Sequence, residues 1–258
     1  MLFRSMTRRL LFMLTAFGTT VAAQWLNYPA QGIPRLPDGK PNLSAPTPRS
    51  ANGKPDLSGL WESERVRQGP FDMPPPIAVK PEDVILTPEG EAWQRQHKES
   101  HFLNAQCLPQ NLVTRMLLPF KILPLRGMVV ILYELYTTYR QIFLDGRELP
   151  KDPNPTWTGY SVGKWDGDTL VVDTSGFNDD QSILPGGRPH SDALHIIERY
   201  RRRDFGHLES QFTIVDPKVY AKPWTIRANS HLTPDTELLE YVCIENEKDL
   251  KHMVGADR

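Results

Sequence analysis

Runs of β-forming residues separated by tight turns constrain the fold of this chain most. The clearest pair covers residues 160–165 and 169–174, around the turn Asp166-Gly167-Asp168. The other runs are residues 128–135 and 139–144, residues 194–203 paired with 208–215, and residues 224–232 paired with 237–244. Short strands joined in sequence order by tight turns predict a mainly β protein. It would be an antiparallel meander that closes as an up-and-down barrel or stays an open, curled sheet.

The N-terminus has the three parts of a secretory signal peptide. Arg4, Arg8 and Arg9 give it a positive start, and residues 10–21 form an apolar stretch. That stretch is too short to span a bilayer, which needs about 20 residues. Val21-Ala22-Ala23 then offers small residues at the positions that signal peptidase reads. We therefore expect removal of residues 1–23 and a periplasmic or secreted mature protein, with a buried N-terminal helix as the alternative.

Residues 24–81 are rich in proline, glycine and asparagine and contain a short duplication. Residues 34–44 (PRLPDGKPNLS) recur as residues 48–58 (PRSANGKPDLS). Because proline is excluded from helix interiors and central strands, we expect an extended arm, laid over the domain or acting as a tether. Thr87-Pro88-Glu89 then favours the start of a helix that runs to about Phe102. Residues 82–258 would form a single β-rich domain with this one N-terminal helix.

Two cysteines and two histidines are candidates for a cross-link and for a metal site. In an oxidising compartment we expect Cys107 and Cys243, the two cysteines of the chain, to form a disulfide. Two free thiols, or Cys107 as a metal ligand, are the alternatives. His97 and His101 share a face of the predicted helix, which suits a metal ion. A closed metal site needs three or four ligands, so ordinary polar residues on an exposed helix end are the alternative.

Composition and motifs argue against several classes of partner. The formal net charge of −1 gives no concentrated positive surface of the kind that phosphate binding needs, so we expect no nucleic-acid partner. Beyond residue 23 no apolar stretch is long enough for a second membrane span. The sequence has neither a phosphate-binding glycine loop nor a c-type haem motif, so we expect no organic cofactor. The oligomeric state is left open.

Strand alternation in residues 194–203 singles out one carboxylate. Glu198 would share its face with Ile196 and Tyr200, which suggests that it is buried. A buried carboxyl has a raised pKa unless it is paired, and is then a candidate general acid or base. The alternative is a buried ion pair with an arginine such as Arg140.

Asp173 and His190 form a second candidate pair. Asp173 lies in the run over residues 169–174, and His190 stands just before the next predicted strand. In contact, the carboxylate would orient the imidazole for acid–base chemistry. Together with Glu198, these two residues are the candidate catalytic groups.

Aromatic and basic side chains on the predicted strands are candidates for lining a pocket. Tyrosine and tryptophan combine an apolar ring with a polar tip, which suits a small, partly apolar molecule. Ordinary core packing is the alternative for most of them. The candidate ligand-binding residues are Tyr139, Arg140, Tyr160, Trp165 and Arg199.

Two parts of the chain resemble known families. Asp56-Leu57-Ser58-Gly59-Leu60-Trp61 looks like the Gly-x-Trp opening of lipocalins, in which the tryptophan plugs the closed end of the barrel. Residues 139–147, 159–174 and 190–204 resemble a large family of exported, uncharacterised bacterial proteins. The first resemblance implies a lipocalin-like barrel, and the second implies export and a β-rich fold. Neither implies an activity.

Three functional hypotheses follow. The first is an exported protein whose interior pocket binds a small, partly apolar molecule. The second is an acid–base enzyme that needs no cofactor (a lyase, isomerase or hydrolase) and uses His190 with Asp173 or Glu198 in the same pocket. The third is a metal-binding protein that uses His97 and His101.

Overall fold

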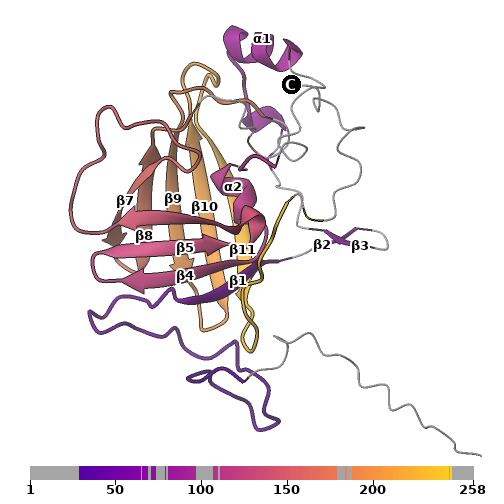
Figure 1. Cartoon of the computed structure of the whole chain (residues 1–258), viewed down its shortest axis with the longest axis vertical. Helices are drawn as coiled ribbons and strands as arrows, with labels where there is room; N and C mark the ends of the chain where they lie inside the picture. The colour runs from indigo at the N-terminus through magenta and orange to yellow at the C-terminus, as the bar shows by residue number, and fades with distance from the viewer. Residues whose placement is uncertain are drawn as a thin grey trace, which may run out of the picture.

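The computed structural model describes residues 29–64, 66–68, 71–73, 79, 81–96, 107–109, 111–178, 184, 188–243 and 245. Nine strands form a closed barrel in the order β1-β11-β10-β9-β8-β7-β6-β5-β4 (Figure 1). They are β1 (Gly59–Ser63), β4 (Phe120–Leu125), β5 (Met128–Tyr133), β6 (Thr138–Phe143), β7 (Tyr160–Asp166), β8 (Thr169–Ser175), β9 (His195–Arg202), β10 (His207–Val215) and β11 (Trp224–Leu232). A separate small sheet pairs β2 (Val66–Gln68) with β3 (Phe71–Met73). The predicted β class is confirmed, and of the two arrangements that the sequence left open the structure has the closed barrel.

One junction of the barrel departs from a strict up-and-down meander. β6 and β7 pair in parallel, over Ile142↔Ser161 and Phe143↔Val162, whereas the other neighbouring barrel strands are antiparallel. A parallel pair needs a connection that returns the chain to the end where the first strand began. Residues 144–159 provide that long link.

The short strand β1 closes the barrel by pairing with both β4 and β11. Trp61 lies opposite Leu232 on one side and Phe120 on the other. The barrel therefore begins inside residues 24–81, the segment expected to be an arm. Because β1 occupies the edge of β11, a following strand has no edge left to pair with. Residues 237–243 form no strand, so the predicted strand over 237–244 is wrong for the residues that the structure describes.

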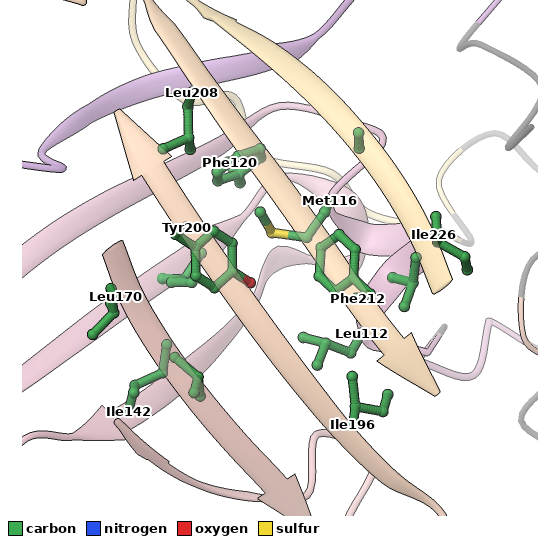
Figure 2. Packing of buried hydrophobic residues seen from close by; sticks show 14 of the residues in the cluster. Leu112, Met116, Phe120, Ile142, Leu170, Ile196, Tyr200, Leu208, Phe212 and Ile226 are labelled. Carbon is green, nitrogen blue, oxygen red and sulfur yellow. The ribbon is translucent and has the colours of Figure 1, made fainter. Parts of the chain in front are cut away.

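The barrel interior is filled by large side chains where the structure describes it. Inward and outward residues alternate along β9, β10 and β11, as strand geometry requires. Phe120, Tyr200 and Phe212 are fully buried and pack together in the interior (Figure 2). The four-residue helix α2 (Leu112–Arg115) and the residue after it add Leu112 and Met116 to this core.

The helix α1 (Pro88–Gln96) begins where the sequence predicted. The hydroxyl of Thr87 accepts a hydrogen bond from the amide of Gly90 at 3.1 Å, the usual N-terminal capping contact. Its predicted continuation to Phe102 lies outside the described residues. Short 3-10 turns cover Pro81–Asp83 and Leu135–Thr137. Within the described segments, no helix is both long and apolar enough to cross a bilayer.

The predicted disulfide between Cys107 and Cys243 is confirmed. The two cysteines lie 136 residues apart in the sequence, and both sulfurs are used in the bond. The alternatives of two free thiols, or of Cys107 as a metal ligand, are therefore wrong.

The two copies of the duplicated motif fold into the same small turn and dock on the barrel in the same way. Figure 1 shows this arm, in indigo, along one end of the barrel. In each copy an arginine donates to the carbonyl oxygen of the turn glycine and to an aspartate beside a barrel strand. The contacts are Arg35 to Gly39 (3.1 Å) and Asp235 (2.6 Å), and Arg49 to Gly53 (2.8 Å) and Asp168 (2.7 Å).

A buried arginine at the end of β9 also fastens the arm. The Nη1 atom of Arg202 donates to the carbonyl oxygens of Asp56 at 2.6 Å and Ser58 at 3.2 Å, and its Nε donates to that of Phe205 at 3.0 Å. The guanidinium lies over the Trp61 ring, 4.9 Å from its centroid. Burial lowers the pKa of Arg202 to about 10, so this arginine remains charged at neutral pH.

Below about pH 4 we expect the two turns of the arm to be held less tightly against the barrel. Hydrogen bonds from Arg49 and Arg35 lower the pKa of Asp168 and of Asp235 below their ordinary value of 3.8. A carboxyl whose pKa is lower in the docked state stabilises docking above its undocked pKa. That contribution is lost as the pH falls through the docked value. Amide hydrogen exchange of residues 34–56 at pH 5 and pH 3, corrected for intrinsic rates, measures this weakening as faster exchange at pH 3.

The double substitution Asp168→Asn and Asp235→Asn is the matched control for this prediction. It removes the two carboxylates that pair with Arg35 and Arg49, so the increase in corrected exchange rate between pH 5 and pH 3 should be smaller than in the wild type. Equal protection of the wild-type arm at pH 5 and pH 3 would contradict the prediction.

Candidate functional site

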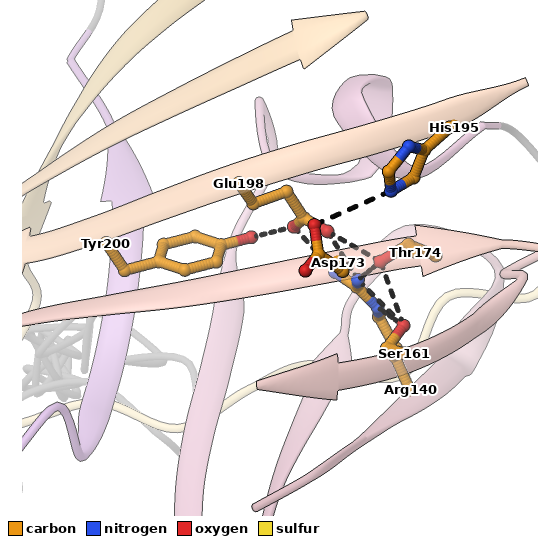
Figure 3. Close-up of polar contacts among 7 residues, drawn as sticks. All are labelled: Arg140, Ser161, Asp173, Thr174, His195, Glu198 and Tyr200. Carbon is orange, nitrogen blue, oxygen red and sulfur yellow. Dashed lines mark hydrogen bonds and ion pairs between the residues drawn. The ribbon is translucent and has the colours of Figure 1, made fainter. Parts of the chain in front are cut away.

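A buried polar network lies in the barrel interior, built from inward positions of four neighbouring strands (Figure 3). Arg140 on β6 faces Glu198 on β9, with Nη2–Oε1 and Nη1–Oε2 distances of 2.5 and 2.8 Å. Arg140 also donates to the hydroxyls of Ser161 at 3.0 Å and Thr174 at 2.6 Å. Tyr200 donates to Glu198 at 2.5 Å. The arrangement satisfies both members of the ion pair without any group from outside.

The charges in this network stabilise each other. Burial alone lowers the pKa of Arg140, but the adjacent Glu198 carboxylate outweighs it, and the net pKa is raised. Burial, with a further contribution from Glu198, raises the pKa of the Tyr200 hydroxyl well above its ordinary value. The structure thus contains the Arg140–Glu198 ion pair that sequence analysis offered as the alternative to a catalytic carboxylate.

The three candidate catalytic residues do not form one constellation. Val172 lies opposite Glu198 and Asp173 lies opposite Ile197, so Asp173 and Glu198 point to opposite sides of the barrel wall. Asp173 instead faces His195, with 3.5 Å between Oδ1 and Nε2. His190 lies before β9, with its Nδ1 3.1 Å from the carbonyl oxygen of the following residue. These positions offer no acid–base pair inside the barrel.

Most candidate ligand-binding residues lie on the outside of the barrel. Tyr139 is 64% exposed. The Tyr160 hydroxyl accepts from Arg147 at 2.9 Å, and the Arg199 guanidinium pairs with Asp166 at 2.8 Å. Trp165, one residue before the end of β7, lies opposite the buried Leu170 and packs against the core. Of the five candidates, Arg140 and Trp165 face inward.

Trp165 lines a cavity where the arm covers one end of the barrel, which we call the mouth cavity. The barrel side consists of Pro124, Leu125, Met128, Val129, Leu144 and Trp165, and the arm side consists of residues 50–52 and 55–57. The cavity volume is about 340 Å³. The six side chains on the barrel side are apolar or aromatic, so an apolar molecule in the cavity would be in favourable contact with each of them.

The arm wall of the mouth cavity is held in place by its own hydrogen bonds. The Ser50 hydroxyl oxygen lies 2.7 Å from the side-chain oxygen of Asn52 and 2.9 Å from the carbonyl oxygen of Lys54, so its single proton is shared between these two acceptors. The ammonium of Lys54 donates to the carbonyl oxygen of Gly167, in the β7–β8 turn, at 3.1 Å. The wall is therefore formed before any ligand arrives.

The candidate metal residues His97 and His101 lie outside the described residues. Among the residues that are described, no group of three or more histidine, cysteine, aspartate or glutamate side chains could hold a metal ion.

Sequence reasoning missed most of the mouth cavity. Alternation from Phe120 and Ile122 on β4, and from Ile131 on β5, places Pro124 and Val129 on the inward face. That signal was available for these inward residues, but the same alternation places Leu125 and Met128 on the outward face. The arm residues had no such signal, because their position depends on the contacts of Arg49 and Arg202 with distant parts of the chain.

Comparison with protein-family models, curated proteins and solved structures gives no match. The function must therefore be argued from the site itself.

Proposed function

We propose that this protein is exported and holds a small, mostly apolar molecule in the mouth cavity. The observation that carries the proposal is the cavity itself, with a volume of about 340 Å³ and an apolar barrel wall. Pockets for small molecules have volumes of roughly 300–1,000 Å³ and are lined mainly by hydrophobic and aromatic side chains. This cavity lies at the lower end of that range and suits a compact ligand.

The position of the cavity supports binding without a large rearrangement. Val129 and Trp165 lie on strands of the closed barrel and Leu144 directly follows β6, and the arm turn opposite them is fixed by internal hydrogen bonds. A preformed site avoids the entropic cost of ordering loops on binding. Trp165 is half-buried and lines the cavity, so its ring would contact a bound molecule directly.

Export is supported by two independent features. The first 23 residues have the pattern of a cleavable signal, and the chain carries the Cys107–Cys243 disulfide. Disulfides persist in oxidising compartments and are rare in the cytosol. The proposed destination is the periplasm or the exterior.

The acid–base alternative has less support than binding. Its carboxylates lie on opposite sides of the barrel wall, and Glu198 is already paired with Arg140. A general base must reach the proton that it removes, directly or through one water. None of the described contacts brings His190 together with Asp173 or Glu198.

The substitution Ala51→Trp is expected to weaken binding of a neutral apolar dye, N-phenyl-1-naphthylamine, by about tenfold or more. Ala51 lines the mouth cavity on the arm side, so an indole there would occupy the space that the dye needs. The protein would be purified from the periplasm, and dye fluorescence would be titrated at excitation wavelengths that tryptophan does not absorb. A mass that lacks residues 1–23 would support the export half of the proposal.

The duplication supplies a matched control. Pro37 occupies the position of Ala51 in the first copy of the motif, is exposed, and does not line the mouth cavity. Pro37→Trp should therefore leave dye affinity unchanged. The binding proposal fails if the wild-type protein does not bind the dye, or if both substitutions weaken binding equally.

A further inference from the structure

Arg115, the last residue of α2, is a buried cation without a counter-ion in the described part of the chain. Its side chain has no exposed surface, and none of its three guanidinium nitrogens has a hydrogen-bond partner there. Asn111 caps the first turn of this helix, accepting from the Thr114 amide at 3.0 Å, and the packing of the helix against the barrel buries Arg115. Leu112 and Met116, on either side in the sequence, are part of the core.

Other buried charges in the described residues have partners, which sets Arg115 apart. Arg140 is paired with Glu198, and Arg202 donates to several backbone carbonyl oxygens. The buried Asp216 accepts from the Ser191 amide at 2.6 Å and from the Ser191 hydroxyl at 2.8 Å. Buried charges are almost always paired or hydrogen-bonded in this way, because an isolated charge loses its hydration without compensation.

A second unpartnered polar group lies beside Arg115. The guanidinium carbon is 5.8 Å from the centroid of the Tyr133 ring. The Tyr133 hydroxyl is itself buried and, although it lies close to Arg140, makes no hydrogen bond of regular geometry with a described residue. Burial lowers the pKa of Arg115; Tyr133 partly offsets this effect and Arg140 adds to it. Arginine nevertheless stays charged near neutral pH.

The geometry points to an anion site at Arg115 and Tyr133, which would take the carboxylate of a small monoanionic molecule. A guanidinium presents a planar fork of donors that matches the two oxygens of a carboxylate. The phenol hydroxyl adds a further donor. This site shares no residue with the mouth cavity and is independent of the function proposed for it.

The charges already present in the barrel interior favour binding of an anion that carries one negative charge. Arg115 and Arg140 are two cations, and Glu198 is the one anion that the described interior network holds against them. One carboxylate would make the group neutral. A dianion such as sulfate would leave an excess negative charge in a low-dielectric interior, which is costly in the same way as the isolated cation.

Acetate alone is the probe for the first experiment. Carbon-13-labelled acetate would be titrated into the mature, disulfide-bonded protein at pH 7 and constant ionic strength, with chloride as the balancing anion. We expect a saturable change in the acetate signal, together with a rise in Tm that chloride does not reproduce. Sulfate at the same ionic strength should not displace the acetate.

Two variants assign the binding to this site. Arg115→Met should abolish saturable acetate binding and should unfold in chloride at a Tm equal to or above that of the wild type. The reason is that methionine removes an uncompensated buried charge. Tyr133→Phe should weaken acetate binding by about tenfold and leave the Tm in chloride unchanged, because it removes one donor to a charged acceptor.

Several results would overturn the inference. The first is the absence of saturable acetate binding by the wild type, which needs no variant to be interpreted. Others are an Arg115→Met protein that still binds acetate, that has a much lower Tm in chloride, or that does not fold. Displacement of acetate by chloride or sulfate at equal concentration would exclude a site selective for a monocarboxylate.

Discussion

Replacement of Glu198 by glutamine is expected to lower the free energy of unfolding by about 3–5 kcal/mol. The carboxylate is fully buried and accepts hydrogen bonds from Arg140, Thr174 and Tyr200. Glutamine has nearly the same shape but no charge, so the Arg140 guanidinium would remain in the interior without a counter-ion. Urea-induced unfolding of the variant and the wild type, followed by tryptophan fluorescence, measures the difference.

Asp166→Asn is the matched control. Asp166 pairs with Arg199, which follows Glu198 on β9, so this substitution also removes one carboxylate from an ion pair. The Arg199–Asp166 pair has a similar length, 2.8 Å, but the Asp166 side chain is 66% exposed. Exposed pairs contribute less than about 1 kcal/mol, since water screens the attraction. We therefore expect Glu198→Gln to lower the free energy of unfolding by much more than Asp166→Asn does. Equal losses would mean that the interior network contributes no more than a surface ion pair.

Strand alternation predicted the face of each residue on β9 but not its neighbours across the barrel. Ile196, Glu198 and Tyr200 point inward as their spacing requires. The period of a strand says nothing about which side chain lies opposite in space. The sequence therefore suggested Arg140 as one possible partner of Glu198, and only the structure shows that the two side chains form an ion pair.

The same rule separates residues that sequence analysis had grouped as one ligand site. Tyr139 and Arg140 are adjacent on β6 and must point to opposite faces, and the structure places Arg140 inside and Tyr139 outside. Grouping by residue type alone overlooked this constraint. The β6–β7 junction and the closure by β1 depend on pairing between distant segments, for which the local pattern holds no signal.

Arg115 shows the limit of sequence reasoning most clearly. It lies in a four-residue helix, which is too short for a repeating apolar pattern to reveal its buried face. Its burial results from the packing of α2 against the barrel. Composition would place an arginine at the surface, since arginine is almost never fully buried unless it is paired.

Removal of the Cys107–Cys243 disulfide is expected to lower the free energy of unfolding by about 4–5 kcal/mol, the value that the chain-entropy model gives for a loop of this length. The bond joins residues 136 apart, and β4 to β11 lie between them. Closing so long a loop excludes most extended conformations of the unfolded chain. Urea unfolding of the double variant Cys107→Ser and Cys243→Ser, compared with the oxidised wild type, measures the loss.

Reduction of the wild type with dithiothreitol is the control that separates the cross-link from the side chains. The reduced wild type and the double variant should have the same stability, and the reductant should not change the variant. A double variant as stable as the oxidised wild type would contradict the prediction. The barrel would then be equally stable in a reducing compartment, and the disulfide would no longer support export. A loss of the expected size would instead make folding of the eight strands inside the loop depend on an oxidising destination.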